Sequence, residues 1–91
     1  MIFKKRDEKL KKELLTKLTK LHYDLTGNSD IVLNEKSRLN HTIGLTSLGK
    51  IQFICLIEDD FDLEISNYSI HSIRTINDLI NYIIKYKYTK R

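Results

Sequence analysis

The sequence predicts an all-α fold, a four-helix bundle with three main helices, a short third helix and a long first loop. Proline is absent, so no residue interrupts a helix by removing a backbone donor. Apolar residues recur at helical spacing in three stretches, and turn-forming residues lie between them. Apolar residues make up 41% and charged residues 31% of the chain, which is typical of globular proteins. We expect residues 1–91 to form a single domain.

A long amphipathic helix is predicted to end near Thr26. Its apolar face spans about 80° of arc at 3.6 residues per turn. Five leucines form this face: Leu10, Leu14, Leu18, Leu21 and Leu25. Gly27 is expected to be the C-cap residue, because glycine readily adopts the left-handed conformation found there. His22 and Tyr23 lie off the leucine stripe, so we expect both at the surface.

A long loop is predicted over residues 28–45, where no apolar period is sustained. Turn-forming residues alternate there with five apolar residues that we expect to anchor the loop: Ile31, Val32, Leu33, Leu39 and Ile43. A loop of this length in a small domain is usually functional or packed by its own side chains.

A second helix is predicted to begin at Ser47, after the turn-prone residues 43–46. We expect Ser47 to be its N-cap residue. Backbone N–H groups at a helix N-terminus lack helical partners, and the helix dipole is positive there. This setting suits a phosphate ester on the serine hydroxyl.

The helix after Ser47 has two apolar faces when it is plotted at 100° per residue. Four residues form the predicted core face: Phe53, Ile54, Ile57 and Phe61. Leu48, Ile51 and Cys55, which we call the docking strip, lie nearly opposite, with Gln52, Glu58 and Asp59 beside them. A domain of about four helices can hardly bury a helix on all sides, so we expect the strip to be an exposed partner surface. The alternative is that the loop covers Leu48 and Ile51.

The residue pattern in the last third of the chain predicts one short helix and one longer helix. Residues 66–73 are polar with two apolar anchors, which indicates an irregular turn or a brief third helix. Thr75 and Asp78 have the spacing of a capping box, with aspartate in place of glutamate. Apolar residues then follow at i, i+3, i+4 and i+7: Ile76, Leu79, Ile80 and Ile83. The tyrosines and lysines after them can bind nucleic acid, but at a chain terminus such a pattern is more often a helix end.

The net charge of +4 is unevenly distributed. Residues 1–20 carry +5, residues 21–84 carry −5 and residues 85–91 carry +4. We expect the basic ends, about 1–6 and 88–91, to be flexible and solvated. The single cysteine, Cys55, excludes an internal disulfide and agrees with a reducing cytoplasm. No apolar run is long enough to span a bilayer, so no membrane association is expected.

Two motifs at a characteristic distance identify a family. Gly44-x-x-Ser47-Leu48 opens an apolar helix, which is followed by the run Glu58-Asp59-Asp60-Phe61-Asp62-Leu63-Glu64-Ile65. Together they resemble an acyl or peptidyl carrier protein, clearly over residues 39–84. The resemblance implies an acyl-carrier-type bundle whose long first loop lies over the helices. It also implies a 4′-phosphopantetheine arm on Ser47, attached by a phosphopantetheinyl transferase with Mg²⁺ and coenzyme A.

The same resemblance implies that the chain is a carrier and not an enzyme. The thiol of the arm, and not Cys55, would hold an acyl or aminoacyl group as a thioester. The docking strip, with Glu58 and Asp59, would meet the transferase, a loading enzyme and downstream synthase enzymes in turn. Lys50 places a positive charge near Ser47 and would select a partner with an acidic patch.

The sequence departs from the fatty-acid carriers of this family in two ways. Those carriers usually show aspartate before the serine, where this chain has Thr46, and Gly49 and Lys50 stand where acidic or neutral polar residues are more usual. Such carriers are also typically acidic along the docking helix, whereas this chain has basic ends. Peptidyl carriers tolerate threonine, so we expect a dedicated carrier for a nonribosomal peptide, polyketide or similar product. The alternatives are a fatty-acid acyl carrier protein and, in a different class, a small helical nucleic-acid- or protein-binding module without an arm.

Three other chemistries are not favoured. His41 lies near Ser47 in the sequence, but no Gly-x-Ser-x-Gly elbow supports a hydrolase. The acidic residues after position 59 resemble the start of a calcium loop, but the glycine and the final glutamate are missing. The three histidines are widely spaced and make no recognisable zinc pattern with one cysteine.

Overall fold

The computed structural model describes residues 5–39 and 45–88, and side chains over 8–39 and 45–87. Every named element in the described part of the chain is a helix, which confirms the predicted all-α fold. They are α1 (Lys5–Thr26), α2 (Ser47–Phe61), α3 (Asn67–Ser72), α4 (Ile76–Ile83) and the π-helical segment η2 (Ile84–Tyr88). Residues 1–4 and 89–91, where flexible ends are expected, lie outside the described part, and α1 already begins at Lys5.

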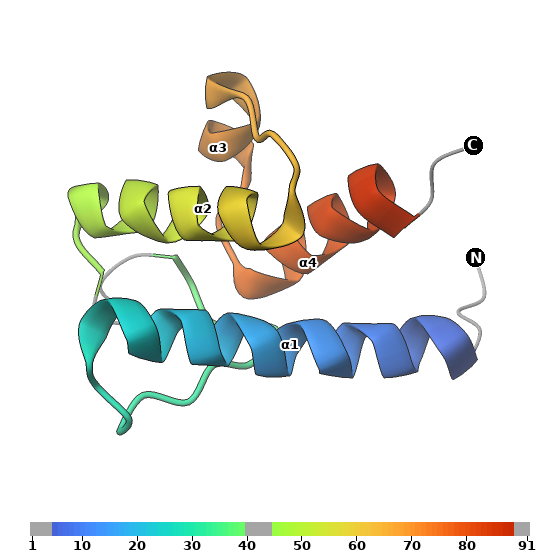
Figure 1. Ribbon diagram of the computed structural model, residues 1–91, viewed down its shortest axis with the longest axis horizontal. Coiled ribbons are helices and arrows are strands. Elements are labelled where there is room, and N and C mark those ends of the chain that lie inside the picture. The colour runs from blue at the N-terminus through green and yellow to red at the C-terminus, as the bar shows by residue number, and fades with distance from the viewer. Residues whose placement is uncertain (1–4, 40–44, 89–91) are drawn as a thin grey trace.

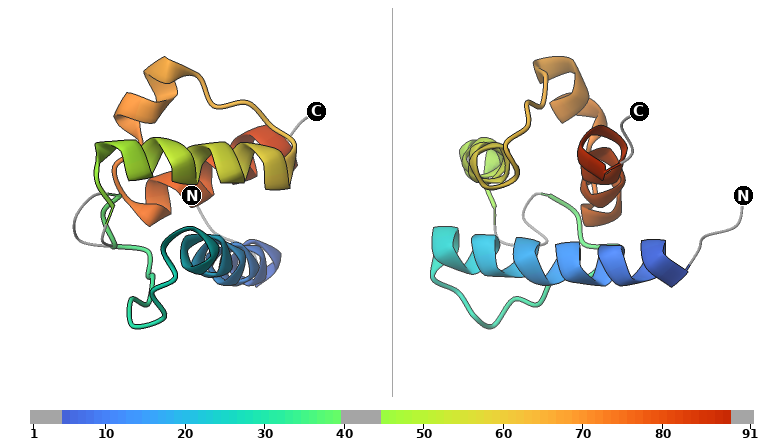
Figure 2. Two further views of the ribbon diagram at one scale, coloured as in Figure 1. Left: turned by 60° about the vertical axis from the view of Figure 1, so that its left-hand side comes forward. Right: turned by 45° about the vertical axis from the view of Figure 1, so that its right-hand side comes forward.

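In Figure 1 α2 lies above α1 and both run along the picture, but the turned views of Figure 2 show that the two helices cross rather than lie parallel. α1 packs against both α2 and α4. Figure 2 shows α1 nearly end-on in the left view, while α2 runs across the picture, and the right view shows the reverse. In all three views α3 lies on the side away from α1, so that α2 and α4 come between them.

A single hydrophobic core joins α1, the long loop, α2, the connections around α3, and α4. Its members are Leu14, Leu18, Leu33, Leu39, Leu45, Phe53, Ile54, Ile57, Phe61, Ile65, Ile73, Ile76, Leu79, Ile80 and Ile83. The core faces predicted for α2 and α4 are therefore confirmed residue by residue. α3 contributes no buried side chain, which explains its weak apolar pattern in the sequence.

α1 has a wider buried face than the leucine stripe indicates. Leu14 and Leu18 are buried, and the other three leucines are half-buried against the core. His22 is only 1% exposed, so the expectation that it lies at the surface is wrong. It lies about 40° from Leu18 around the helix, and its ring meets Phe53 of α2 edge-on at a centroid distance of 6.0 Å. Tyr23 is exposed, as expected.

α1 ends at a glycine cap. Gly27 has φ of 70°, in the left-handed region, and its N–H donates to the Tyr23 carbonyl at 2.7 Å. This confirms the predicted C-cap, where glycine avoids the steric cost that a Cβ atom meets at positive φ.

The long loop is held by buried side chains and by hydrogen bonds to the start of α4. Leu33 and Leu39 are buried, whereas Val32 is 75% exposed, so the expectation that Val32 anchors the loop is wrong. Ile43 lies outside the described residues. Val32 lies between Ile31, which is half-buried, and Leu33, which is buried, so only its neighbours in the chain face the core.

The first amides of α4, which have no helical partner, donate to loop carbonyls. The Ile76 N–H donates to Ser37 O at 2.8 Å and the Asn77 N–H donates to Glu35 O at 2.9 Å. Thr75 and Asp78 complete the predicted capping box at the same end. The loop is therefore docked on the N-terminus of α4.

Candidate functional site

Ser47 is the first residue of α2 and is exposed. The N-cap residue is Thr46, which has extended backbone angles and whose side chain accepts a hydrogen bond from the Gly49 N–H at 3.1 Å. The Thr46 carbonyl accepts the first helical bond, from the Lys50 N–H, at 2.8 Å. The expectation that Ser47 caps the helix is therefore wrong by one residue. Because Thr46 satisfies the cap, the Ser47 hydroxyl is not used for it and makes no hydrogen bond to any described residue.

The other serines differ from Ser47 in their contacts. The Ser37 side chain is buried and accepts from the Asn34 N–H at 3.0 Å. The hydroxyls of Ser66, Ser69 and Ser72 take part in hydrogen bonds at α3. Ser29 lies in the turn after α1, away from any helix N-terminus. Within the described part of the chain, Ser47 alone combines an exposed hydroxyl free of hydrogen bonds with a helix start.

The docking strip is exposed. Leu48 is 64% exposed, Ile51 is 50% exposed and Cys55 is also exposed. On the opposite face of the same helix, Phe53 and Ile57 are fully buried. These exposures contradict the alternative that the loop covers Leu48 and Ile51, and they leave an apolar surface that starts beside Ser47.

The carboxylates near the end of α2 have different surroundings. Glu58 is half-buried, and its Oε2 accepts from the Ile65 N–H at 2.8 Å, which ties the connection after α2 to the helix. Asp60 forms an ion pair with Lys17 of α1 at 3.2 Å. Asp59 is exposed and makes no ion pair with any described residue. Glu58 therefore has a structural contact, and Asp59 remains open to a partner.

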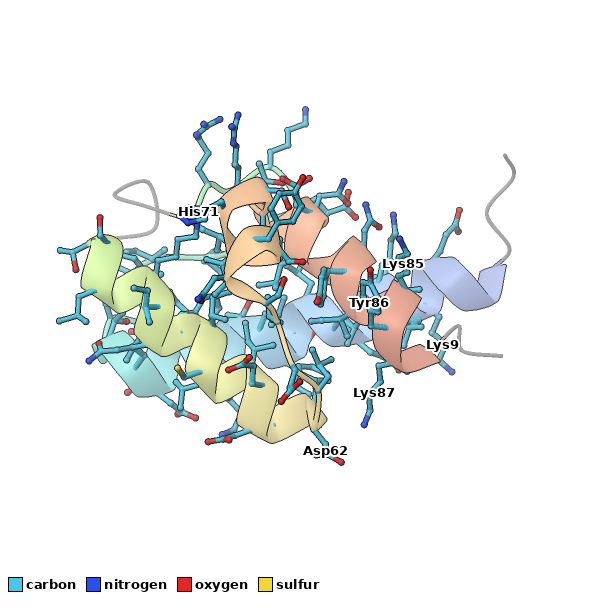
Figure 3. The ribbon with its side chains drawn as sticks, turned by 90° about the horizontal axis from the view of Figure 1, so that it is seen from above. Lys9, Asp62, His71, Lys85, Tyr86 and Lys87 are labelled. Atoms are coloured by element: carbon cyan, nitrogen blue, oxygen red, sulfur yellow. The ribbon has the colours of Figure 1, made fainter. Side chains whose placement is uncertain are left out.

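A shallow acidic hollow of about 640 Å³ lies at this end of α2. Asp62, at the C-terminal end of α2, and Tyr86, on η2, are among its lining residues and are labelled in Figure 3. The remaining lining residues are Glu58, Asp59, Leu63 and Glu64. The exposed face of α2 thus ends in negative charge.

The opposite end of α2 opens on a basic cavity of about 340 Å³ that includes Ser47. Its described lining residues are Arg38, Leu39, Leu45, Thr46, Ser47, Lys50 and Arg74. The predicted closeness of Lys50 to Ser47 is therefore confirmed, and its Nζ donates to the Ile70 carbonyl at 3.3 Å. Arg38 and Arg74 were not singled out from the sequence. The only signal for them there is that they are rare cations in an acidic segment.

The remaining sequence candidates do not gather into a site. His41 lies outside the described residues, His22 is buried and His71 is exposed at the end of α3. Over residues 5–39 and 45–88, no group of three or more His, Cys, Asp or Glu side chains is arranged to hold a metal ion. Across those same residues, no helix combines the length and apolar character that crossing a bilayer requires.

The aromatic and basic residues at the C-terminal end contact one another. The ring centroids of Tyr82 and Tyr86 lie 4.4 Å apart, and Lys85 Nζ lies 5.2 Å from the Tyr86 ring centroid. The Tyr82 hydroxyl donates to the Glu64 carbonyl at 3.2 Å. Figure 3 shows Lys85, Tyr86 and Lys87 on these last turns. Tyr82 therefore ties the last helix to the connection before α3.

The site around Ser47 suits an ester-linked anion. An exposed hydroxyl stands at a positive helix end, beside three cations and next to an exposed apolar strip. A phosphate ester on this hydroxyl would have cationic donors within the same cavity, and a group attached to it would be presented beside the strip.

Comparison with known proteins identifies the family. A sequence profile described as the phosphopantetheine attachment site matches residues 17–83. The chain is also similar to an acyl carrier protein of Cyanidioschyzon merolae, with 25% identity over 75 residues that cover 82% of each chain. These matches favour a carrier over an armless binding module. The chain belongs to the phosphopantetheine-attachment-site family and is a carrier protein whose covalently attached prosthetic group is 4′-phosphopantetheine.

Proposed function

We propose that Ser47 Oγ is the attachment atom and that the chain carries an acyl or aminoacyl group for a dedicated biosynthetic pathway of nonribosomal peptide or polyketide type. The observation that carries the attachment proposal is that Ser47 starts α2 with an exposed hydroxyl free of hydrogen bonds to described residues. A transferase must reach this oxygen, and a hydroxyl already engaged as a cap would first have to break its bond.

The chain performs no chemistry in this proposal. Thr46 caps the helix, so α2 begins correctly whether or not Ser47 is modified. When bound, the prosthetic group supplies a terminal thiol for a thioester, and Cys55 takes no part in that bond. We further infer that residues 1–91 form one carrier domain, since Leu14, which precedes the matched range, is buried in the same core as Leu79 and Ile80.

The docking strip is proposed to meet the phosphopantetheinyl transferase, the loading enzyme and downstream synthase enzymes in turn. Such transient interfaces are modest in area, and charges at their rim steer orientation and rate. Asp59, and Glu58 to a smaller extent, would supply negative rim charge at one end of the strip, and Lys50 would supply positive charge at the other.

A fatty-acid carrier is the second candidate, favoured by the similarity to a protein named as an acyl carrier protein. Thr46 and the cations beside Ser47 support the dedicated carrier instead, because fatty-acid carriers typically have aspartate before the serine and acidic docking helices. The genes beside the coding sequence discriminate the two. An adenylation or ketosynthase gene of a specialised cluster supports the dedicated carrier, and a fatty-acid synthesis cluster contradicts it.

Intact mass spectrometry tests the attachment site. The wild-type chain, incubated with coenzyme A, Mg²⁺ and a broad-range phosphopantetheinyl transferase, should gain the mass of one arm. Fragmentation should place the arm on Ser47, and Ser47→Ala should gain nothing while keeping its helical circular dichroism spectrum. Ser29→Ala, which changes the other exposed serine without a described hydrogen bond, is the matched control and should load normally. Loading of Ser47→Ala, or an arm on another serine, would contradict the proposal.

A further inference from the structure

The basic cavity beside Ser47 concentrates the positive charge of an acidic segment. Residues 21–84 contain four basic residues, Lys36, Arg38, Lys50 and Arg74, against nine acidic ones. Three of these four line the cavity, and no carboxylate is among its described lining residues. Lys36 is the exception and lies outside it. A segment with net negative charge thus directs most of its cations toward one serine.

The three cations come from separate parts of the chain that are tied together. Arg38 pairs with Thr75 in an isolated antiparallel bridge, and the Leu39 N–H donates to Arg74 O at 2.9 Å. These contacts bring the long loop beside the connection between α3 and α4. Lys50 reaches from α2 to Ile70 O, which places its ammonium group toward the same side.

The two guanidinium groups have capacity to bind an anion. Neither Arg38 nor Arg74 makes an ion pair or side-chain hydrogen bond with any residue of the described part. The backbone of each is nevertheless held, since Arg38 lies in the bridge and the Arg74 N–H donates to Asp78 Oδ2 at 3.1 Å. A guanidinium presents paired N–H donors that match phosphate oxygens, and an ammonium has three donors, of which Lys50 uses one on Ile70.

We propose that Arg38, Lys50 and Arg74 form a phosphate cradle, which holds the phosphodiester of the arm against the protein body; this inference rests on the proposed attachment at Ser47. Because Ser47 lines the cavity, a phosphate ester on its oxygen lies in the cavity or at its mouth. The cavity volume of about 340 Å³ is many times the roughly 10–15 Å³ that one water molecule needs, which leaves room for a phosphate and the first carbons of the arm. Leu39 and Leu45 provide an apolar wall for those carbons.

The cradle would fix where the arm leaves the protein. A covalently tethered phosphate has a high effective concentration at these cations, so weak individual contacts suffice to hold it. The same cations are also complementary to an acidic partner surface. The phosphate is the favoured occupant because it is bonded to a residue of the cavity itself, whereas a partner would have to bring its charge from outside.

Phosphorus NMR of the loaded protein, together with thermal unfolding of loaded and unloaded protein, tests the cradle. At low salt the wild-type phosphodiester should give a broad ³¹P line, because a held phosphate tumbles with the protein. Loading should raise Tm by roughly 2–5 °C, as expected for a few exposed ionic contacts in a domain of this size. Both effects should diminish in 1 M NaCl, where the Debye length is about 3 Å.

Charge-matched variants give the decisive comparison. Arg38→Gln with Arg74→Gln should narrow the ³¹P line and remove the Tm gain on loading. Lys9→Gln with Lys36→Gln, which removes two exposed cations outside the cavity, should keep both effects. Comparing loaded with unloaded protein for each variant separates the cradle from any effect on folding.

The outcomes distinguish the two proposals. If mass spectrometry finds no arm on Ser47, the attachment proposal fails and the cradle fails with it. If Ser47 is loaded but the ³¹P line and the Tm gain are the same in both double variants, the cradle alone is wrong. A loading rate that falls only in the Arg38 and Arg74 variant, with an unchanged ³¹P line, would then assign these cations to an acidic partner.

Discussion

Thr46 and Gly49 are joined by the hydrogen bond that caps α2, with Thr46 Oγ1 accepting from the Gly49 N–H at 3.1 Å. Ser47, the first helical residue after this cap, is thereby left with an exposed hydroxyl. A Cβ atom at Gly49 would lie 3.3 Å from Leu45 Cδ2, so the end of the loop approaches the helix closely at this position. Thr46 caps the helix and the adjacent Ser47 is the proposed attachment residue, so mutation can separate the two roles.

We expect Thr46→Ala to lower the free energy of unfolding by about 1 kcal/mol, because it removes the N-cap acceptor. Ser47→Ala should change it by no more than about 0.5 kcal/mol, as for other exposed positions without special contacts. Chemical denaturation of the unloaded proteins measures both. Thr46→Ala should still accept an arm, because Ser47 is intact. A larger stability loss in Ser47→Ala than in Thr46→Ala would contradict the division.

The two faces of α2 should respond differently to truncation. Ile57→Ala creates a cavity in the core and should cost roughly 2–5 kcal/mol. Ile51→Ala removes a half-exposed side chain and should change stability by less than about 1 kcal/mol, yet it should slow loading by the transferase. Denaturation curves and initial loading rates measure the two effects. Equal destabilisation by both variants would show that Ile51 is core and that the strip does not dock partners.

Cys55 offers a direct probe of the docking strip, because it is the only cysteine and is exposed. Treatment of the unloaded protein with a maleimide should modify this thiol rapidly and leave Tm and the helical spectrum nearly unchanged. The adduct should slow loading, since its bulk stands between Ser47 and the end of α2. Cys55→Ser, treated in the same way, is the control and should load at the untreated rate. Normal loading of the adduct would place the partner surface elsewhere.

Substitutions at Glu58 and at Asp59 should have different effects, the first on stability and the second on partner recognition. Glu58→Ala leaves the Ile65 N–H without its acceptor and should cost about 1–3 kcal/mol. Asp59→Lys should leave stability within about 0.5 kcal/mol but slow loading at low salt, with the difference from wild type shrinking as salt is raised. Initial loading rates across a salt series provide the measurement. A salt-independent defect in Asp59→Lys would argue against electrostatic steering at this position.

The helices of this chain were predictable because their signals are local. The apolar period of α2 and α4 identified the core faces, and Gly27, Thr75 and Asp78 marked helix ends by their own backbone preferences. The opposed apolar strip on α2 was also predictable, since a helix of 3.6 residues per turn places Ile51 and Ile57 on different faces by spacing alone. Its exposure followed from the small number of helices available to cover it.

The tertiary structure decided what surrounds Ser47. Arg38 and Arg74 reach the basic cavity because the loop is hydrogen-bonded to the connection before α4, and bonds between distant backbone groups leave no periodic trace in the sequence. The burial of His22 depends likewise on α2 lying across α1, where Phe53 meets the imidazole ring beside the leucine stripe. By itself the sequence determined where the helices lie, which faces are apolar and which serine opens α2, since these depend on neighbours in the chain. The charge around that serine depends on neighbours in space, and only the folded loop brings them together.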